Sequence, residues 1–261
     1  MKIVVINLAT ERDRWAAVSR QFARVGLSAH RFDAVVGRDV TEAQRALLYS
    51  PHLNARQYHR PLQAGEVGCY ASHLLVWQHL VDSKEARIAV FEDDVDIDPG
   101  LPETLQAIDC TERPWDIVKL IGRRPESAAS RWPLDAGRQL IAYRRVPGLT
   151  SAYVIRREAA EKLLARRIPF GRPIDVDLRH WWECDLRVHG VWPYPVYPAP
   201  SSLLSTIEGR RRSRAPAVRI RKFVLQARYS MQNWQARQAL RLGLRQDARP
   251  QRASLADRPA R

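Results

Sequence analysis

The first forty residues combine short apolar runs with one longer amphipathic segment. Residues 2–8, KIVVINL, are too short for a buried helix and rich in strand-forming side chains, so they predict a buried strand. In residues 10–25 apolar side chains recur at helical spacing, at Trp15, Val18, Phe22 and Val25, and a glycine follows where a helix should end. Residues 28–40 contain a second predicted strand. This strand–helix–strand order indicates a βαβ unit and a parallel sheet.

A second apolar run, residues 88–91, leads directly into a dense group of carboxylates. The sequence IAVF predicts a buried central strand, and five acids lie within the next seven residues: Glu92, Asp93, Asp94, Asp96 and Asp98. Such carboxylates repel one another unless a positive charge neutralises them. A divalent cation such as Mg²⁺ or Mn²⁺ prefers oxygen ligands of this kind. Ligands of open α/β sheets bind at the carboxyl ends of strands, where this group would lie. The alternative is a solvated acidic turn.

The rest of the chain continues the alternation of strands and helices. We expect helices in residues 62–83, 101–108 and 156–167, strands in 115–121 and 149–155, and a mobile loop over 122–138. In the first of these helices His73 lies on an apolar stripe, where a histidine is more often a core residue than a ligand. Ser72 and His73 also lie near a glycine-bearing helix start, which can receive phosphate or hydroxyl groups.

Two further carboxylates, Asp175 and Asp177, lie at the opening of a helix predicted within residues 173–192. Acidic residues at a helix N-terminus are common as capping residues. A catalytic role and a capping role therefore both stay open for this pair.

The positive charge is concentrated near the end of the chain. Of the formal net charge of +15, residues 208–261 contribute +12, so residues 1–207 are close to neutral. We therefore expect two units, a folded domain over 1–207 and a basic tail over 208–261. A nucleic-acid-binding protein usually carries its basic patch on the folded domain, so no specific nucleic acid is expected.

The tail contains one amphipathic helical stretch within residues 210–237. Its apolar side chains are Ile220, Phe223, Val224, Ala227, Met231 and Trp234, with arginines mostly around them. A basic helix with aromatic side chains is typical of binding to an anionic membrane surface, and packing back on the body is the alternative. Beyond Gln246 we expect disorder. Three widely spaced cysteines in no metal-binding pattern favour a reduced, cytoplasmic protein. The basic helix favours a peripheral position at the inner face of the cytoplasmic membrane.

Several motifs together resemble glycosyltransferase family 25. They occur in the family's order: INLATERDR at 6–14, GEVGCYASH at 65–73, AVFEDDV at 89–95, LTSAYVI at 149–155, PIDVDL at 173–178 and SLLSTI at 202–207. The resemblance covers about residues 1–207. It implies a GT-A-like α/β fold, with a mostly parallel Rossmann-type sheet flanked by helices. It also implies a UDP-sugar donor, typically UDP-galactose, a divalent cation (Mn²⁺ or Mg²⁺), and inversion at the anomeric carbon.

The resemblance also implies roles for single residues. Asp94 matches the metal-holding position, with Asp96 as a second candidate ligand. Asp175 is the first candidate for the catalytic base that the acceptor hydroxyl requires, and Asp177 the second. The remaining candidates would surround the nucleotide-sugar donor: Asn7, Leu8, Arg12, Arg14, Asp33, Ser72, His73, Glu92 and Asp93.

The predicted function is transfer of a sugar, galactose first, to an oligosaccharide or lipid-linked glycan such as lipooligosaccharide or lipopolysaccharide core. One alternative is a metal-dependent phosphodiesterase or nuclease that uses the same carboxylates, with the tail holding nucleic acid. Another is a non-catalytic membrane- or nucleic-acid-binding module in which the tail is the functional part.

Overall fold

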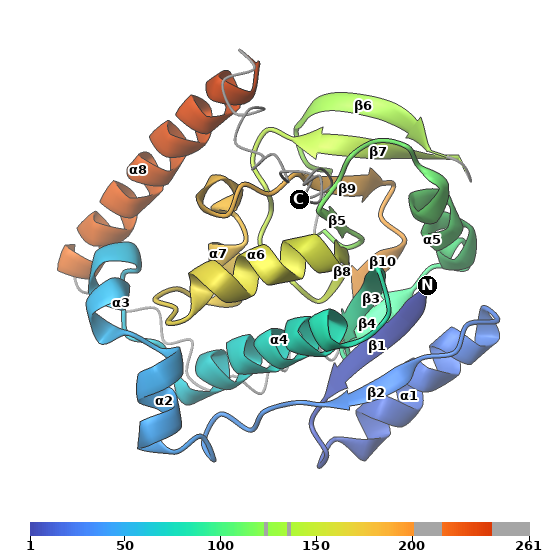
Figure 1. Ribbon diagram of the computed structural model, residues 1–261, viewed down its shortest axis with the longest axis horizontal. Coiled ribbons are helices and arrows are strands. Elements are labelled where there is room, and N and C mark those ends of the chain that lie inside the picture. The colour runs from blue at the N-terminus through green and yellow to red at the C-terminus, as the bar shows by residue number, and fades with distance from the viewer. Residues whose placement is uncertain (123–124, 135–136, 201–215, 242–261) are drawn as a thin grey trace, which may run out of the picture.

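The computed structural model describes residues 1–122, 125–134, 137–200 and 216–241. Its main sheet has eight strands in the order β2-β1-β3-β8-β5-β9-β7-β6 (Figure 1). A second sheet of two strands pairs β4 (Val95–Ile97) with β10 (Val196–Pro198). The expected α/β class is confirmed, with helices on both faces of the large sheet.

The N-terminal part of the sheet is parallel, as the βαβ pattern predicts. Strand β1 (Lys2–Asn7) pairs in parallel with β2 (His30–Asp33) and with β3 (Arg87–Glu92), and α1 (Arg12–Arg24) connects β1 to β2. The carboxyl ends of these three strands therefore lie at one edge. Asn7 aligns with Asp33, and Ile6 aligns with Glu92.

The sheet as a whole is mixed, so the expectation of a mostly parallel sheet is wrong. Strand β8 (Ala152–Arg156) inserts antiparallel between β3 and β5 (Ile117–Lys119), and β9 (Val188–Trp192) then pairs in parallel with β5. The antiparallel β6–β7 hairpin completes the far edge. An apolar run fits either direction, because its pattern encodes burial and carries no information about the orientation of its neighbours.

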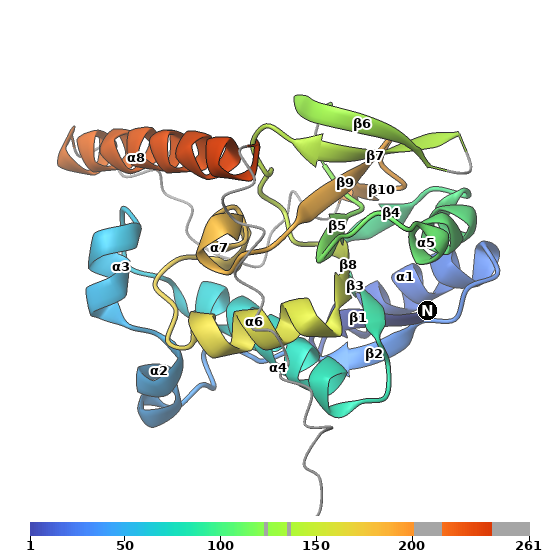
Figure 2. The ribbon, with the colours of Figure 1, turned by 45° about the horizontal axis from the view of Figure 1, so that its top comes forward.

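Helices cover the sheet on both faces (Figure 2). A hydrophobic core on each face holds them to it. Val4 and Ile6 of β1 face the core formed with α4 (Ala64–Asp82) and α6 (Arg157–Arg167). Ile3 and Val5 face the opposite core, formed with α1 and α5 (Leu101–Cys110). Alternate side chains of a strand point to opposite faces, so a strand covered on both sides must be apolar throughout.

Two segments differ from their predicted structures. Much of 122–138, expected to be a mobile loop, is strand β6 (Ala128–Leu134), which pairs with β7 (Arg138–Tyr143). Leu134 of β6 is part of the core formed with α1 and α5, and Trp132 packs against that core. The guanidinium carbon of Arg113 lies 4.3 Å from the centre of the Trp132 ring. In 173–192 the long helix is replaced by α7 (Ile174–Asp177), a short 3₁₀ turn η1 (Trp181–Glu183) and β9. Asp185, at φ 50°, marks the reversal between the turn and the strand.

The remaining helices lie at the periphery. Two short helices, α2 (Glu42–Leu48) and α3 (Pro51–Gln57), precede α4, and α8 (Pro216–Arg241) packs near α3 and α7. No helix among the described residues has the length and apolar character needed to cross a membrane. The predicted boundary at residue 207, the SLLSTI motif and the segment beyond Gln246 lie outside the described residues.

Candidate active site

The acidic residues after β3 lie where the carboxyl ends of β1 and β3 meet the start of β8. Because β8 runs antiparallel to β3, its first residues lie beside the end of β3, and Ser151 comes next to Glu92. Main-chain pairing thus brings three distant segments together. This is the edge at which α/β sheets bind ligands.

Asp93 is held by two of the residues predicted from the sequence. The buried side chain of Asn7 donates to Asp93 Oδ2 at 2.6 Å and to the carbonyl of Glu11 at 3.0 Å. Arg14, in the first turn of α1, forms an ion pair with Asp93 Oδ1 at 2.5 Å. Burial raises the pKa of Asp93, although the Asn7 hydrogen bond and the Arg14 charge oppose the rise.

Asp94 is less well neutralised. Arg14 lies 3.6 Å from Asp94 Oδ2, while the buried Oδ1 has no hydrogen-bond partner among the described residues. Burial, followed by the nearby charge of Glu92, raises the pKa of Asp94 to about 6. A buried carboxylate oxygen without a donor, among like charges, suits a hard divalent cation. The residues present therefore fit the metal implied by the sequence.

Glu92 is connected to the core by a chain of hydrogen bonds. Trp77 Nε1 donates to the Tyr153 hydroxyl at 2.9 Å, and that hydroxyl lies 2.9 Å from His73 Nδ1. The indole can only donate, so the tyrosine hydroxyl can give its own proton to Nδ1 of His73. Nδ1 is then an acceptor, and the hydrogen of the neutral imidazole lies on Nε2. This hydrogen faces Glu92 Oε1, which lies 3.4 Å from Nε2.

Ser151 Oγ donates to the other carboxylate oxygen of Glu92 at 2.9 Å. Burial opposes ionisation of Glu92, but the hydrogen bonds from His73 and Ser151 outweigh it and lower the pKa. Glu92 is thus kept as an oriented anion. His73 is a buried core residue that links Tyr153 to Glu92 at the edge of the site.

Cys69 is a residue that the sequence reasoning did not include. Potential ligand atoms of Cys69, His73 and Glu92 lie within 4.8 Å of one another. The signal was available in GEVGCYASH, because a cysteine and a histidine four residues apart share one face of a helix. Burial, followed by the charge of Glu92, raises the pKa of the Cys69 thiol well above its usual range.

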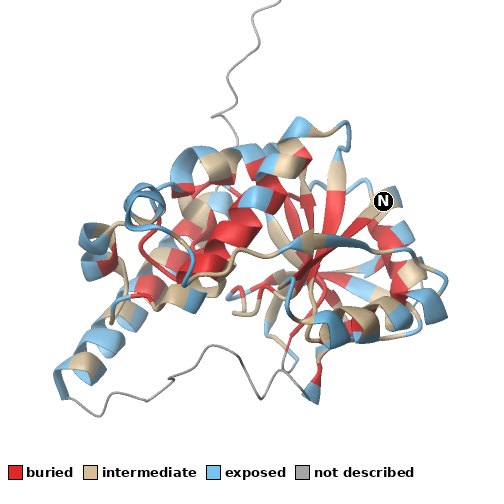
Figure 3. Ribbon diagram, turned by 90° about the horizontal axis from the view of Figure 1, so that it is seen from below, coloured by how far each residue is buried: buried red, intermediate tan, exposed pale blue. Residues whose placement is uncertain are grey.

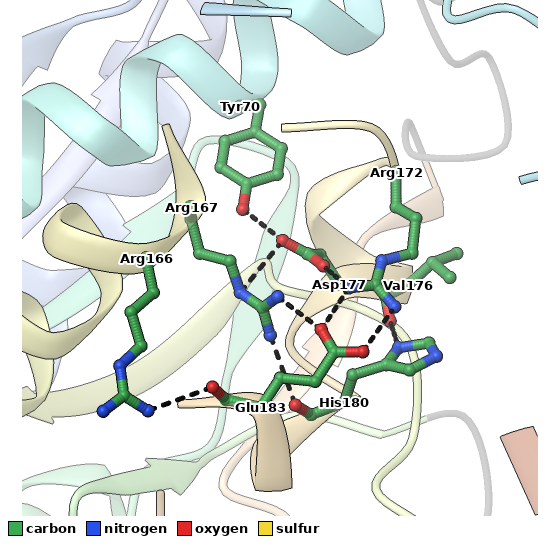
Figure 4. Close-up of polar contacts among 8 residues, drawn as sticks. All are labelled: Tyr70, Arg166, Arg167, Arg172, Val176, Asp177, His180 and Glu183. Carbon is green, nitrogen blue, oxygen red and sulfur yellow. Dashed lines mark hydrogen bonds and ion pairs between the residues drawn. The ribbon is translucent and has the colours of Figure 1, made fainter. Parts of the chain in front are cut away.

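The two candidate bases differ in their surroundings. Asp177 is buried and accepts a hydrogen bond from the Tyr70 hydroxyl at 2.5 Å (Figure 4). It also pairs with Arg172 at 2.7 Å and Arg167 at 3.3 Å. Both arginines contact Glu183 as well, each at 2.5 Å, and lower its pKa to about 2 against the effect of burial. Asp177 is therefore one member of a buried ion network.

Asp175 is half-buried and lies in different surroundings from Asp177. A side-chain carbon added to Gly148 would lie 3.5 Å from Asp175 Oδ2, which places Asp175 beside the loop before β8. Its negative charge lies close enough to interact electrostatically with Cys69, Arg60 and Lys119. Of the two carboxylates, the geometry favours Asp175 for contact with a substrate.

Lys119 is a second residue that sequence reasoning missed. Its buried ammonium group, at the end of β5, donates to the carbonyls of Pro147, Gly148 and Leu149. By binding these three carbonyls, Lys119 fixes the loop that precedes Ser151. The loop includes Leu149, whose φ is 69°. A lysine in a short apolar strand gives no local sign of such a role.

The other predicted residues are less closely grouped. Ser72 donates to the Gly68 carbonyl and accepts from the Val35 amide, both at 2.8 Å, so it joins α4 to the segment after β2. Asp33 is exposed at the end of β2 and pairs with Arg31. The remaining three lie around α1: Leu8 accepts from the Glu11 amide, Arg12 is exposed, and Asp96 on β4 lies 3.4 Å from the Gln21 amide nitrogen.

These features describe an α/β protein with a carboxylate-rich candidate site at the carboxyl edge of its sheet. The family model of glycosyltransferase family 25 (LPS biosynthesis protein) matches residues 1–178. The chain belongs to this family, and the family resemblance seen in the sequence is confirmed.

Relatives in the family are distant and longer. A glycosyltransferase 25 family member of Anopheles gambiae is 26% identical over 181 residues, which cover 67% of this chain and 30% of the relative. Procollagen galactosyltransferase 1-A of Xenopus laevis is 26% identical over 218 residues, 76% of this chain and 36% of the relative. A Bos taurus relative, 28% identical over 219 residues with the same two coverages, is named probable inactive glycosyltransferase 25 family member 3. The chain thus spans about a third of the length of these relatives.

Two solved structures show a low overall likeness. The inositol-1-phosphate CTP transferase of T. maritima has a TM-score of 0.35 at 12% identity, with 78% of this chain and 72% of that chain covered. Mouse xyloside xylosyltransferase 1 has a TM-score of 0.31 at 14% identity, with 72% and 64% covered. Likeness at this level carries no argument about function.

Proposed function

We propose that this family 25 glycosyltransferase is a metal-dependent, inverting hexosyltransferase. It would move galactose from UDP-galactose to a glycan acceptor such as lipooligosaccharide or lipopolysaccharide core. The observation that carries the proposal is the group formed by Asn7, Arg14, Asp93 and Asp94, in which a buried carboxylate oxygen has no donor.

Asp94 would hold the divalent cation, Mn²⁺ or Mg²⁺, supported by the oriented carboxylate of Glu92. Such a cation supplies Lewis-acid stabilisation of the charge that develops on a departing diphosphate. Asp96 is the weaker candidate ligand, since its carboxylate lies near Gln21 of α1.

Arg14 has a guanidinium between two carboxylates and lies within reach of both. It would pair with donor phosphate and at the same time hold Asp93 in place. Asn7 and Leu8, at the end of β1, would contact the uridine, with Asp33 at the end of the next strand beside the base or ribose.

Asp175 would accept the proton of the acceptor hydroxyl as it attacks the anomeric carbon. A base must lie within hydrogen-bond reach of that hydroxyl. Asp177 is committed to two arginines and a tyrosine, whereas Asp175 is half-buried beside the loop that Lys119 fixes.

The names of the relatives support a galactosyl donor and also show why activity has to be measured. One is a procollagen galactosyltransferase and another is named probable inactive.

A lipid-linked acceptor would place the protein in the cytoplasm at the inner face of the membrane.

The test is release of UDP from a panel of nucleotide sugars, with Mn²⁺ and with EDTA. We expect turnover of one donor, loss of turnover with EDTA, and a large loss in Asp94→Asn. The matched control is Asp39→Asn, a change at an exposed carboxylate outside the site. Asp96→Asn decides whether the second carboxylate is a ligand, and the geometry predicts a smaller effect than at Asp94.

Equal turnover with Mn²⁺ and with EDTA would contradict the metal role. No UDP release from any donor, together with no Mn²⁺-dependent UDP binding, would contradict the transferase function itself. Turnover that survives Asp94→Asn would overturn the assignment of that residue alone.

A further inference from the structure

Helix α8 turns its large aliphatic side chains and Trp234 away from the body. Its buried side chains, Tyr229, Asn233 and Ala236, follow helical spacing along one face. The large apolar side chains lie on the opposite face and are mostly open to solvent, with exposed fractions as follows: Ile220 64%, Phe223 75%, Val224 57%, Met231 56% and Trp234 62%. Much of α8 is correspondingly pale blue in Figure 3. A helix that covers a core normally presents the reverse arrangement.

Specific polar contacts fix this orientation. Asn233 Oδ1 accepts from Trp181 Nε1 at 3.1 Å, and Asn233 Nδ2 donates to the Arg144 carbonyl at 2.9 Å. The ring of Tyr229 packs against His180 and Trp182, with the Arg179 guanidinium 4.4 Å from its centre. Near the start of the helix, Arg221 donates to the carbonyls of Ala55 and Tyr58. The apolar face is therefore turned outward by contacts that the rest of the molecule supplies.

Basic grooves flank the exposed face on both sides. A cavity of 860 Å³ along one side is lined by Arg144, Arg145, Arg237 and Arg241, with Glu126 as its carboxylate. A cavity of 440 Å³ along the other side is lined by Arg56, Arg179, Lys222 and Arg228. Its carboxylate, Glu183, already pairs with Arg167 and Arg172. Each groove is thus lined by more basic than acidic side chains, which favours anionic groups.

We propose that the outward face of α8 docks on an anionic phospholipid membrane. Phe223, Trp234 and their apolar neighbours would insert at the depth of the headgroups, and the arginines of the two grooves would bind lipid phosphates. A row of apolar side chains between two rows of cations matches a bilayer interface, which offers apolar chains beneath a negatively charged plane. A second copy of the chain fits less well, because apposed α8 faces would bring the flanking cations together.

The docking rests on the proposed function in one respect: a lipid-linked acceptor would be presented on the same membrane. Helix α8 packs against η1 and lines a groove together with Val176 of α7, the helix that carries the candidate base Asp175 (Figure 2). Docking by α8 would therefore hold the site near the membrane plane.

The test is flotation of the full-length protein with vesicles of phosphatidylcholine alone or mixed with phosphatidylglycerol. We expect binding to the mixed vesicles that weakens at high salt, and about a tenfold lower partition coefficient for the double variant Phe223→Ser/Trp234→Ser. The matched control, Leu47→Ser/Leu75→Ser, removes two exposed apolar side chains elsewhere and should bind like the wild type.

Equal flotation with the two vesicle types, or equal binding by both double variants, would overturn the docking surface. Concentration-dependent dimerisation without vesicles, lost in Phe223→Ser/Trp234→Ser alone, would show that a second copy occupies the face instead. UDP release from free donor, measured on the same variants without vesicles, should not change. Failure of membrane docking and failure of the transferase function are therefore told apart.

Discussion

At the scale of single residues, Asp94 has the least balanced surroundings in the site. Its pKa of about 6 results first from burial and then from the charge of Glu92, and Arg14 compensates in part. The folded protein therefore binds a proton at this carboxyl more tightly than the unfolded chain does. The stability that the protonated group contributes is present below its usual pKa of 3.8 and is lost as the pH rises through about 6.

Because the pKa of Asp94 is raised in the folded protein, we expect Asp94→Asn to stabilise the metal-free protein. In EDTA at pH 7.5 we expect the free energy of unfolding to rise by about 1–3 kcal/mol, because the uncompensated charge is removed. The difference should shrink at pH 5, where the wild-type carboxyl is largely protonated. Thermal melts in EDTA at the two pH values measure this. Added Mn²⁺ should raise the melting temperature of the wild type and leave the variant unchanged, and a variant less stable than the wild type at pH 7.5 would contradict the prediction.

The residues of the acidic edge were predictable because their motif is contiguous. Glu92, Asp93 and Asp94 follow a recognisable buried strand, and Asn7 ends another. Lys119 was not predictable, because its role depends on carbonyls about thirty residues further along the chain.

At the scale of elements, α7 separates two carboxylates that are nearly adjacent in sequence. Asp177 faces Tyr70 of α4 and Arg167 of α6, whereas Asp175 lies beside the loop before β8. The capping interpretation is wrong for both, because the N-cap residue of α7 is Pro173 and no side chain caps the helix. Asp177 is instead part of a buried ion network, and the catalytic role stays a prediction for Asp175. In the sequence the two residues were equivalent apart from their place in the motif.

We expect Asp177→Asn to act on stability and Asp175→Asn on activity. Removing the charge of Asp177 leaves two buried guanidinium groups with Glu183 as their remaining acid, which should cost about 3 kcal/mol or more and roughly 6–12 °C in melting temperature. Asp175→Asn should melt close to the wild type and lose most of its transfer rate. The two variants serve as controls for each other in melting and in transfer to acceptor. A stable, inactive Asp177→Asn would reverse the assignment.

At the scale of the whole molecule, α8 is attached to the body through few buried side chains: Tyr229, Asn233 and Ala236. Asn233 joins it to η1 through Trp181 and to the segment after β7 through the Arg144 carbonyl. A helix held this way can open without unfolding of the two cores, because its large apolar side chains contribute little to them.

Asn233→Ala should therefore loosen α8 selectively. The loss of both hydrogen bonds leaves Trp181 Nε1 and a carbonyl without partners, a cost of about 1–3 kcal/mol. Amide hydrogen exchange in α8 should become about tenfold faster or more, while exchange in β1 and β3 stays the same. Gln235→Ala, a change at an exposed position of the same helix, is the control. Equal acceleration in α8 and in the central strands would mean that α8 is part of the global folding unit.

The sequence by itself determined the alternation of strands and helices, the position of the acidic group after β3, and the family. These are encoded in local apolar periodicity and in contiguous motifs. Tertiary structure alone decided the antiparallel direction of β8, the pairing of β6 with β7, the division of roles between Asp175 and Asp177, and the outward turn of the apolar face of α8. Each of these depends on partners distant in the chain: Tyr70 and Asp177 are 107 positions apart, and Trp181 and Asn233 are 52 apart. A local pattern shows that a side chain is apolar or charged, but the neighbour that buries or neutralises it is fixed only when the chain folds.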